Sequence, residues 1–438
     1  MEQALKILEP VELGQRIEEC MDGTQKDVLT SITTWVNDFD TQNILWLSGS
    51  PGAGKSTISS SIISTLFHDK RLASKFFFQR GSKHLTPSAL WRTVAFHLAQ
   101  FDTKMKGLLA HLLKEHEIDL ETPKLDYLFK RLIEVPMQGS GDSLLQKHPV
   151  IVIDGLDECG DANDRRALLN TLRSCSQLPR TFKIFVTSRG DDDISSSLHD
   201  ISQCIELPTG RRVTFESSQD IRLFFKTRFA SVVSRYPGEL QASWPGNPIL
   251  EELTAQAAGL FIWAKTVVSF VDSDEHPIEQ LSLIQEGQIA NADIDALYRT
   301  ILDHALGNVS ANLLNAFQKV VGTIMIARES LPRHILRHFL GDGVTSLDIK
   351  VILRKLRSVI SEEQQDGLLW ICHQSFADCL MDPKRSKQFA LDISVLCSHL
   401  VSQFNDEESF HVFVSIEDED AQMVVKLLQA VRLAVCFC

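Results

Sequence analysis

Short apolar runs alternate with amphipathic stretches between residues 44 and 207. The runs that predict β-strands span residues 44–48, 75–79, 149–154, 183–188 and 204–207. Those at 149–154 and 183–188 are nearly continuous in β-branched and aromatic residues, which is typical of strands buried on both faces. Strands that alternate with helices predict an α/β fold with a parallel sheet covered by helices on both sides.

Two segments of this region carry a stronger local signal. Residues 86–100 predict a helix, because Thr86 suits the N-cap, Pro87 suits the first turn, and Trp91, Val94 and Leu98 share one face. Residues 138–147 (QGSGDSLLQK) hold two glycines among polar residues and predict a loop before the third strand.

After residue 207 the pattern becomes helical, with almost no strand signal. One apolar stripe passes through residues 221–232, and a second passes through residues 250–271. Further helices are predicted at 294–306, 313–327, 332–340 and 347–360, followed by a short strand at 368–372. Several short helices followed by a strand suit a winged-helix arrangement.

Composition narrows the class of protein. A chain of 438 residues suits two or three domains, and its net charge of −13 argues against a partner held through nucleic-acid phosphates. Nine scattered cysteines without a C-x-x-C pair indicate reduced thiols rather than disulfides or zinc. The longest apolar stretch, 259–271, contains Lys265 and is too short to span a membrane, so we expect a cytoplasmic protein without a membrane partner.

A glycine-rich motif follows the first predicted strand. Residues 49–56 (GSPGAGKS) fit G-x-x-x-x-G-K-[ST], the Walker A pattern, between a strand and a helix. The glycines let backbone N–H groups face phosphates, Lys55 would reach the β- and γ-phosphates, and the Ser56 hydroxyl would bind Mg²⁺. The predicted nucleotide-binding residues are Gly49, Ser50, Pro51, Gly52, Ala53, Gly54, Lys55, Ser56 and Thr57. The alternative is a glycine-rich turn without a ligand.

Three carboxylates follow the strand at 149–154. Asp154 ends the strand and is expected to hold Mg²⁺ at the carboxyl edge of the sheet, as a Walker B aspartate does. Asp157 or Glu158 would orient or deprotonate an attacking water, and we favour Glu158 as the general base. Solvated acidic residues after a strand are the alternative.

Two further residues are candidates for contacts with phosphate. Arg189 follows the strand at 183–188 and is placed to stabilise γ-phosphate charge, although a surface arginine capping a strand is the alternative. His373, in ICHQSF, is either a core histidine or a ligand for the nucleotide. The apolar stripe through 259–271 is better explained by helix packing than by a ligand site.

Together these motifs resemble the fungal NACHT proteins, an NLR-like branch of the STAND nucleotide switches. The resemblance rests on Cys20, Gly23-Thr24, Trp35, GSPGAGKST, VIVIDGLDE, FVTSR, GLFIWA and HQSF, and extends from about residue 20 to about residue 400. It implies an ASCE-type P-loop NTPase domain followed by helical and winged-helix subdomains. The expected boundaries are an N-terminal segment 1–30, a NACHT domain 31–209, a small helical domain 210–285, a winged helix 286–385 and a C-terminal helical segment 386–438.

The resemblance also implies a function. Exchange of ADP for ATP would open the module and let copies self-associate, with slow hydrolysis as the reset and with an unidentified protein partner. Arg189 corresponds to the sensor arginine of the family, and His373 to the histidine that contacts the β-phosphate of ADP.

Two departures from the family pattern concern the bound nucleotide. Gly259-Leu260-Phe261 replaces a Gly-x-Pro hinge, and Gln374 replaces an aspartate after His373. No effector domain precedes the module and no repeats follow it, so the chain is expected to be truncated or degenerate. A nucleotide-binding scaffold without turnover and a P-loop phosphotransferase are the alternative functions.

Overall fold

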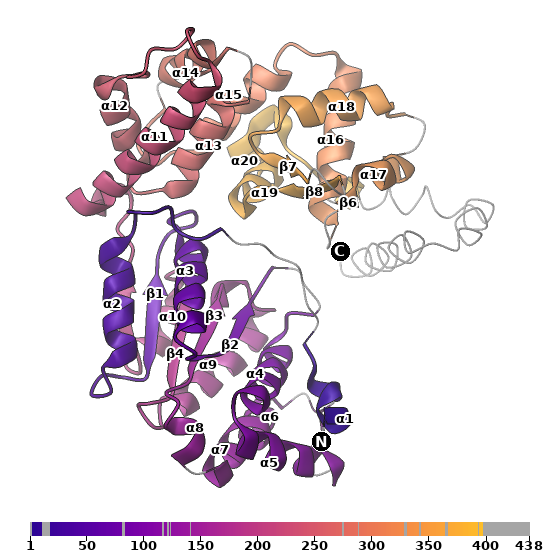
Figure 1. Cartoon of the computed structure of the whole chain (residues 1–438). Helices are drawn as coiled ribbons and strands as arrows, with labels where there is room; N and C mark the ends of the chain where they lie inside the picture. The colour runs from indigo at the N-terminus through magenta and orange to yellow at the C-terminus, as the bar shows by residue number, and fades with distance from the viewer. Residues whose placement is uncertain are drawn as a thin grey trace, which may run out of the picture. The chain divides into compact units, whose positions relative to one another are not determined.

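A computed structural model gives the fold (Figure 1). It describes residues 2–396 except 11–17, 81–83, 116–117, 121, 123, 141, 274–275, 288, 328–330, 341–342, 364–366 and 393, so most of the predicted segment 386–438 lies outside the described residues. The chain forms two compact units, Met1–Phe224 and Phe225–Cys438. Each is treated by itself below.

The first unit is built on a parallel five-stranded sheet. Its strands are β1 (Ile44–Ser48), β2 (Leu72–Phe77), β3 (Val150–Asp154), β4 (Lys183–Ser188) and β5 (Gln203–Glu206). The order is β2-β3-β4-β1-β5, so β4 lies between β1 and β3. This insertion is the ASCE-type arrangement, and the α/β prediction is confirmed.

Alternate residues of the strands face two separate cores. Leu45 and Leu47 of β1 pack with α2 (Lys26–Asn37) and α3 (Lys55–His68). Ile44 and Trp46 pack into a second core with α4 (Pro87–Phe101) and α9 (Ala162–Cys175). Every residue of β1, β3 and β4 is buried, as their apolar runs predicted. Burial on both faces fixes the positions of the strand ends, and therefore the positions of the first residues of the loops that follow them.

The predicted loop at 138–147 is wrong. Most of this segment is helical, in α7 (Val135–Ser140) and α8 (Asp142–Leu145). The reason is tertiary, because Met137 and Leu144 are buried in the core and hold the helical turns in place despite the glycines. The second strand also begins earlier than predicted, at Leu72.

The remaining elements of the first unit are short helices around the sheet. They are α1 (Glu2–Leu5), η1 (Lys6–Leu8), α5 (Thr103–Lys114), α6 (Leu125–Phe129), η2 (Lys130–Glu134), η3 (Leu156–Glu158), α10 (Asp192–Leu198) and η4 (Gly210–Arg212). Leu5 and Leu8 are buried in the core that α4 and α9 share, so the N-terminal residues belong to this unit.

Helix α11 (Phe215–Arg235) contains the division between the units, and α12 (Asn247–Ala257), α13 (Phe261–Val271) and α14 (Pro277–Glu286) follow. The stripe predicted through 250–271 is interrupted, because Ala258 and Gly259 have φ values of 43° and 82° and end α12. The Gly259-Leu260-Phe261 segment is therefore the turn between two helices.

The rest of the second unit combines helices with a small antiparallel sheet. The helices are α15 (Ile294–Leu306), α16 (Ala311–Ile326), α17 (Arg333–Leu340), α18 (Ser346–Lys355), α19 (Gln374–Met381), α20 (Pro383–Ser386) and η5 (Lys387–Phe389). Strands β6 (Leu331–Pro332), β8 (Leu368–Ile371) and β7 (Ile360–Glu362) lie in that order. Of these three strands only β8 was predicted, and the winged-helix arrangement stays a prediction.

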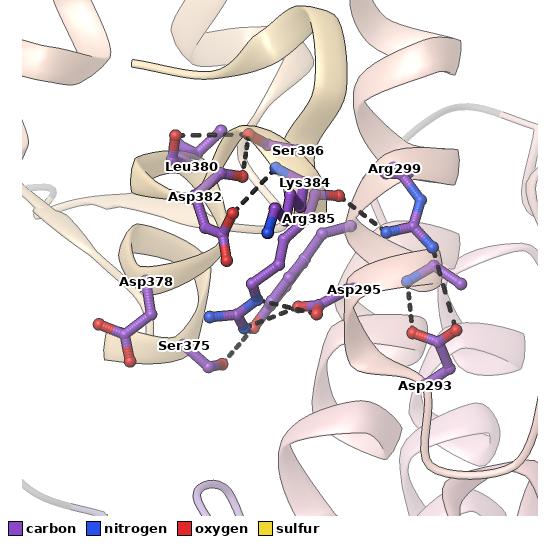
Figure 2. A network of polar contacts seen from close by, with 12 residues as sticks. Asp293, Asp295, Arg299, Ser375, Asp378, Leu380, Asp382, Lys384, Arg385 and Ser386 are labelled. Carbon is purple, nitrogen blue, oxygen red and sulfur yellow. Dashed lines mark hydrogen bonds and ion pairs between the residues drawn. The ribbon is translucent and has the colours of Figure 1, made fainter. Parts of the chain in front are cut away.

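An ion-pair network fixes α20 against α15 (Figure 2). Arg385 donates two hydrogen bonds to the Asp295 carboxylate, at 2.9 and 2.8 Å. Arg299 in turn donates to the Arg385 carbonyl oxygen at 2.8 Å. The two-pronged contact sets both distance and orientation, so α19 and α20 are held in one position relative to α15. No helix in the described part of the chain is long and apolar enough to cross a bilayer.

Candidate nucleotide site

The predicted phosphate loop lies between β1 and α3. Its last glycine, Gly54, has a φ of 100° and precedes the first helical residue, Lys55. Only glycine adopts that conformation without strain, and it turns the chain from the strand into the helix. At the start of the loop, a Cβ on Gly49 would lie 3.0 Å from the Leu207 Cβ, so this position also needs a small residue.

Lys55 points back into the loop. Its ammonium group donates to the carbonyl oxygens of Gly49 and Ser50, at 2.7 and 3.1 Å. Burial lowers the pKa of Lys55, and the charges of Asp157 and Asp154 partly oppose that shift. The lysine therefore lies in the electrostatic field of Asp154 and Asp157, while its contact with phosphates stays a prediction.

Asp154 lies at the end of β3, almost fully buried at 4% exposure. Its Oδ1 accepts hydrogen bonds from Ser59 of α3 at 2.6 Å and from Thr187 of β4 at 2.7 Å. No described residue donates to Oδ2, which leaves that oxygen available to another ligand. Ser56 lies one turn before Ser59 on α3, and therefore on the same helix face.

Asp157 and Arg189 form a two-point contact across the ends of β3 and β4. The Arg189 backbone N–H donates to Asp157 Oδ1 at 2.9 Å, and its Nε lies 3.0 Å from Oδ2. The Asp157 side chain is only 3% exposed. Both carboxylate oxygens are therefore engaged by one residue, and the arginine side chain is held at the site instead of capping the surface.

Glu158 is bound less tightly. Its Oε2 accepts one backbone hydrogen bond, from Arg80 at 3.1 Å. Burial raises the pKa of Glu158, while that hydrogen bond and the charge of Arg189 act in the opposite direction. A carboxylate with a raised pKa and few donors is a better proton acceptor than one held by an arginine.

Some residues around the site were missed in the sequence. Ser59 lies beyond the motif, and its bond to Asp154 depends on the close approach of α3 and β3. Thr209 bonds the Ser50 hydroxyl at 2.9 Å, across 159 positions of sequence. No local pattern signals either pairing, since both arise from the packing of distant segments.

His373 lies in the second unit, and the structure gives it a local role. It is the N-cap of α19, where its Nδ1 accepts from the Ser375 backbone N–H at 3.1 Å. Ser375 also bonds the Tyr298 hydroxyl at 2.8 Å, which links the cap to α15. Contact between His373 and a phosphate stays a prediction.

The sheet order and the loop between β1 and α3 define the class: the first unit is a P-loop NTPase fold of the ASCE type. Residues 23–189 match the family model described as Nephrocystin 3, N-terminal. The chain is also 24% identical over 339 residues to the vegetative incompatibility protein HET-E-1 of Podospora anserina, which confirms the resemblance to a fungal NACHT-type protein. That match covers 73% of this chain but 23% of HET-E-1, so the chain spans less than a quarter of its relative.

Solved structures show weaker likenesses. The STAND protein with a tetratricopeptide repeat sensor from Pyrococcus horikoshii has a TM-score of 0.47 at 10% identity, covering 96% of this chain and 50% of that one. The Walker-type ATPase of Pyrococcus abyssi has a TM-score of 0.38 at 13% identity, covering 83% and 97% of the two chains.

Proposed function

We propose that this chain is an ATP/ADP switch of the NACHT type, which hydrolyses ATP slowly and self-associates in its ATP state. The observation that carries the proposal is the phosphate-loop turn at Gly54, which places Lys55 at the start of α3 and in the electrostatic field of Asp154, Asp157 and Glu158. One cation, a helix N-terminus and several carboxylates at a sheet edge suit a magnesium–triphosphate ligand. The assignment of adenine as the base of the nucleotide follows from the resemblance to the fungal NACHT proteins.

In this proposal the phosphates replace the loop carbonyls as partners of Lys55. The two hydrogen bonds to Gly49 and Ser50 satisfy a buried ammonium group that would otherwise be costly to bury. A triphosphate offers stronger acceptors at the same position, since its oxygens carry charge. The backbone N–H groups from Gly49 to Thr57 would then bind the phosphates.

The residues present also fit a magnesium ion. Asp154 offers Oδ2, and the Ser56 hydroxyl lies on the face of α3 that holds Ser59. Oxygen ligands of this kind suit Mg²⁺, which neutralises phosphate charge when bound. Ser59 and Thr187 orient the Asp154 carboxylate toward that role.

We assign the general base to Glu158 and a positioning role to Asp157. Glu158 has the raised pKa and a single backbone donor, so it can take a proton from water. Asp157 is engaged by Arg189 at both oxygens, so it instead holds the arginine in place.

The proposed slow turnover would follow from the Arg189–Asp157 pair. In this proposal Arg189 reaches the γ-phosphate only when its Nε leaves the Asp157 carboxylate. A hydrogen bond between charged groups contributes roughly 1.5–3 kcal/mol, the same order as the bias that a two-state switch requires. The ion pair would therefore oppose the change to the ATP state. The γ-phosphate of ATP could replace the contact that Arg189 loses, whereas ADP has no γ-phosphate.

Nucleotide binding tests the proposal most simply. We expect calorimetry to show that ATP and ADP bind the chain with Mg²⁺, and that Lys55→Ala weakens ATP roughly 10- to 100-fold through loss of charged hydrogen bonds. Lys104→Ala, an exposed lysine on α5 of the same unit, is the matched control and should bind as wild type.

Two results would contradict the proposal. If the wild-type chain is folded and binds neither ATP nor ADP, the phosphate-loop motif does not bind nucleotide in this protein. If Lys55→Ala is folded and binds ATP as tightly as wild type, nucleotide binds elsewhere. Tight binding with no turnover would favour the scaffold alternative, and transfer of the γ-phosphate to a small molecule would favour the phosphotransferase.

A further inference from the structure

A basic cavity lies in the second unit, and none of its lining residues is assigned to the nucleotide. Its volume is about 450 Å³, and it lies between α18 and the β6-β8-β7 sheet. Four cationic side chains line it: Arg333, Lys350, Arg354 and Arg357. This volume falls within the range of roughly 300–1,000 Å³ that small-molecule sites occupy.

Helical spacing brings three of these cations together. Lys350, Arg354 and Arg357 are four and three positions apart, on α18 and the turn after it, so they share one side. All three are exposed, and none makes an ion pair or hydrogen bond through its side chain with any described residue. Like charges at this spacing repel one another, so an anion placed among them would relieve a cost that the free protein carries.

Among the described residues that line the cavity, Glu362 of β7 is the one acidic residue. It lies 3.5 Å from Arg333, so no described lining residue supplies a counter-charge to Lys350, Arg354 or Arg357. The floor is apolar, formed by Leu353, Ile360 and Leu369, which are 6%, 3% and 1% exposed. Cations around an apolar floor suit a ligand with several negative groups on an organic body.

The charge of the whole chain favours a compact ligand over a long one. The chain has a net charge of −13, which would repel an extended polyanion such as nucleic acid beyond the few contacts that the cavity offers. A small molecule bearing several phosphates stays within the local positive field. Arginine recognises phosphate well, because its planar donors can engage two oxygens at once.

We propose that this cavity binds a compact polyphosphorylated small molecule, as a second anion site distinct from the phosphate loop. Arg354 and Arg357 would supply the forked donors, and Lys350 a further point charge. The ligand would bind within the second unit only. Nucleotide at the phosphate loop is therefore not needed for it.

Calorimetry on the full-length Lys55→Ala chain tests this without nucleotide binding at the phosphate loop. The probes are inositol hexakisphosphate, which has an organic body, and tripolyphosphate, which has none. We expect both to bind, the first more tightly because of the apolar floor. Arg354→Ala combined with Arg357→Ala should weaken both at least tenfold, while Lys226→Ala, an exposed lysine on α11, leaves both unchanged.

Several outcomes would overturn the proposal. It fails if neither probe binds at millimolar concentration, or if the Arg354/Arg357 variant is folded by its melting temperature and binds as the parent does. It also fails if a short DNA duplex binds this face more tightly than either probe. Because the phosphate loop is disabled throughout, these failures are independent of the nucleotide-switch proposal.

Discussion

The charged side chains of the candidate site bind other groups of the chain. Lys55 donates to the carbonyl oxygens of its own loop, and Arg189 binds Asp157 at two points. In the proposed switch, nucleotide binding would exchange these contacts for new ones. The affinity for nucleotide and the rate of hydrolysis would then depend on how much stronger the new contacts are than the old ones. A single substitution can test each contact.

Glu158 gives a pH dependence with a definite sign. Its pKa is raised by burial, so the carboxylate becomes an effective base only at a pH above that of an ordinary glutamate. We expect the single-turnover rate of ATP hydrolysis to rise with pH through that raised pKa. Glu158→Gln should lower the rate about 100- to 10,000-fold and remove this limb of the profile.

Glu115→Gln is the control, since Glu115 is an exposed residue that ends α5. It should leave both rate and profile unchanged. A Glu158→Gln chain that binds ATP and hydrolyses it at the wild-type rate would rule out Glu158 as the base.

The chemistry of single residues could be predicted from sequence where a motif fixes their position. Lys55 and Asp154 lie in short segments whose sequence indicates the adjoining helix and strand, and the charge of Asp154 acts on the pKa of Lys55. The Arg189–Asp157 contact was not predicted, because it depends on β3 and β4 being neighbours. That adjacency is a property of the sheet order, which the apolar runs do not encode.

Helices and strands could be predicted where their burial or capping shows as a pattern of neighbouring residues in the sequence. The apolar runs at β3 and β4 predicted strands buried on both faces, and Thr86 was predicted to cap α4. The helices at 135–145 were missed because distant core contacts at Met137 and Leu144 outweigh the glycines. The turn at Ala258 was missed because its apolar stripe continues through the break.

Helix α4 allows a test of whether the predicted N-cap residue stabilises its helix. Its N-cap hydroxyl, on Thr86, accepts a hydrogen bond from the Ala89 N–H at 3.1 Å. Thr86→Ala should lower the free energy of unfolding by about 1 kcal/mol, because that N–H loses its partner. Urea unfolding followed by circular dichroism would measure it.

Thr103→Ala is the matched control, because Thr103 is exposed at the first position of α5, which Asp102 caps. It should change the free energy of unfolding by less than half a kcal/mol. Equal effects of the two substitutions would show that the Thr86 cap does not stabilise α4.

At the scale of the whole molecule, the chain is proposed to change its conformation and to self-associate when ATP binds. The nucleotide site lies in the first unit, while His373 and the basic cavity lie in the second. A switch needs ligands that distinguish two states, and γ-phosphate and the proposed polyphosphate would be two such ligands on different units. The chain spans 23% of HET-E-1.

Molar mass measured in each nucleotide state tests the central claim most directly. Light scattering after size exclusion should give a larger mass for the Glu158→Gln chain in Mg²⁺ and ATP than in Mg²⁺ and ADP, because hydrolysis is blocked and the ATP state persists. Lys55→Ala should keep the smaller mass in both. An identical mass in ATP and ADP, from a chain that binds both nucleotides, would contradict the switch.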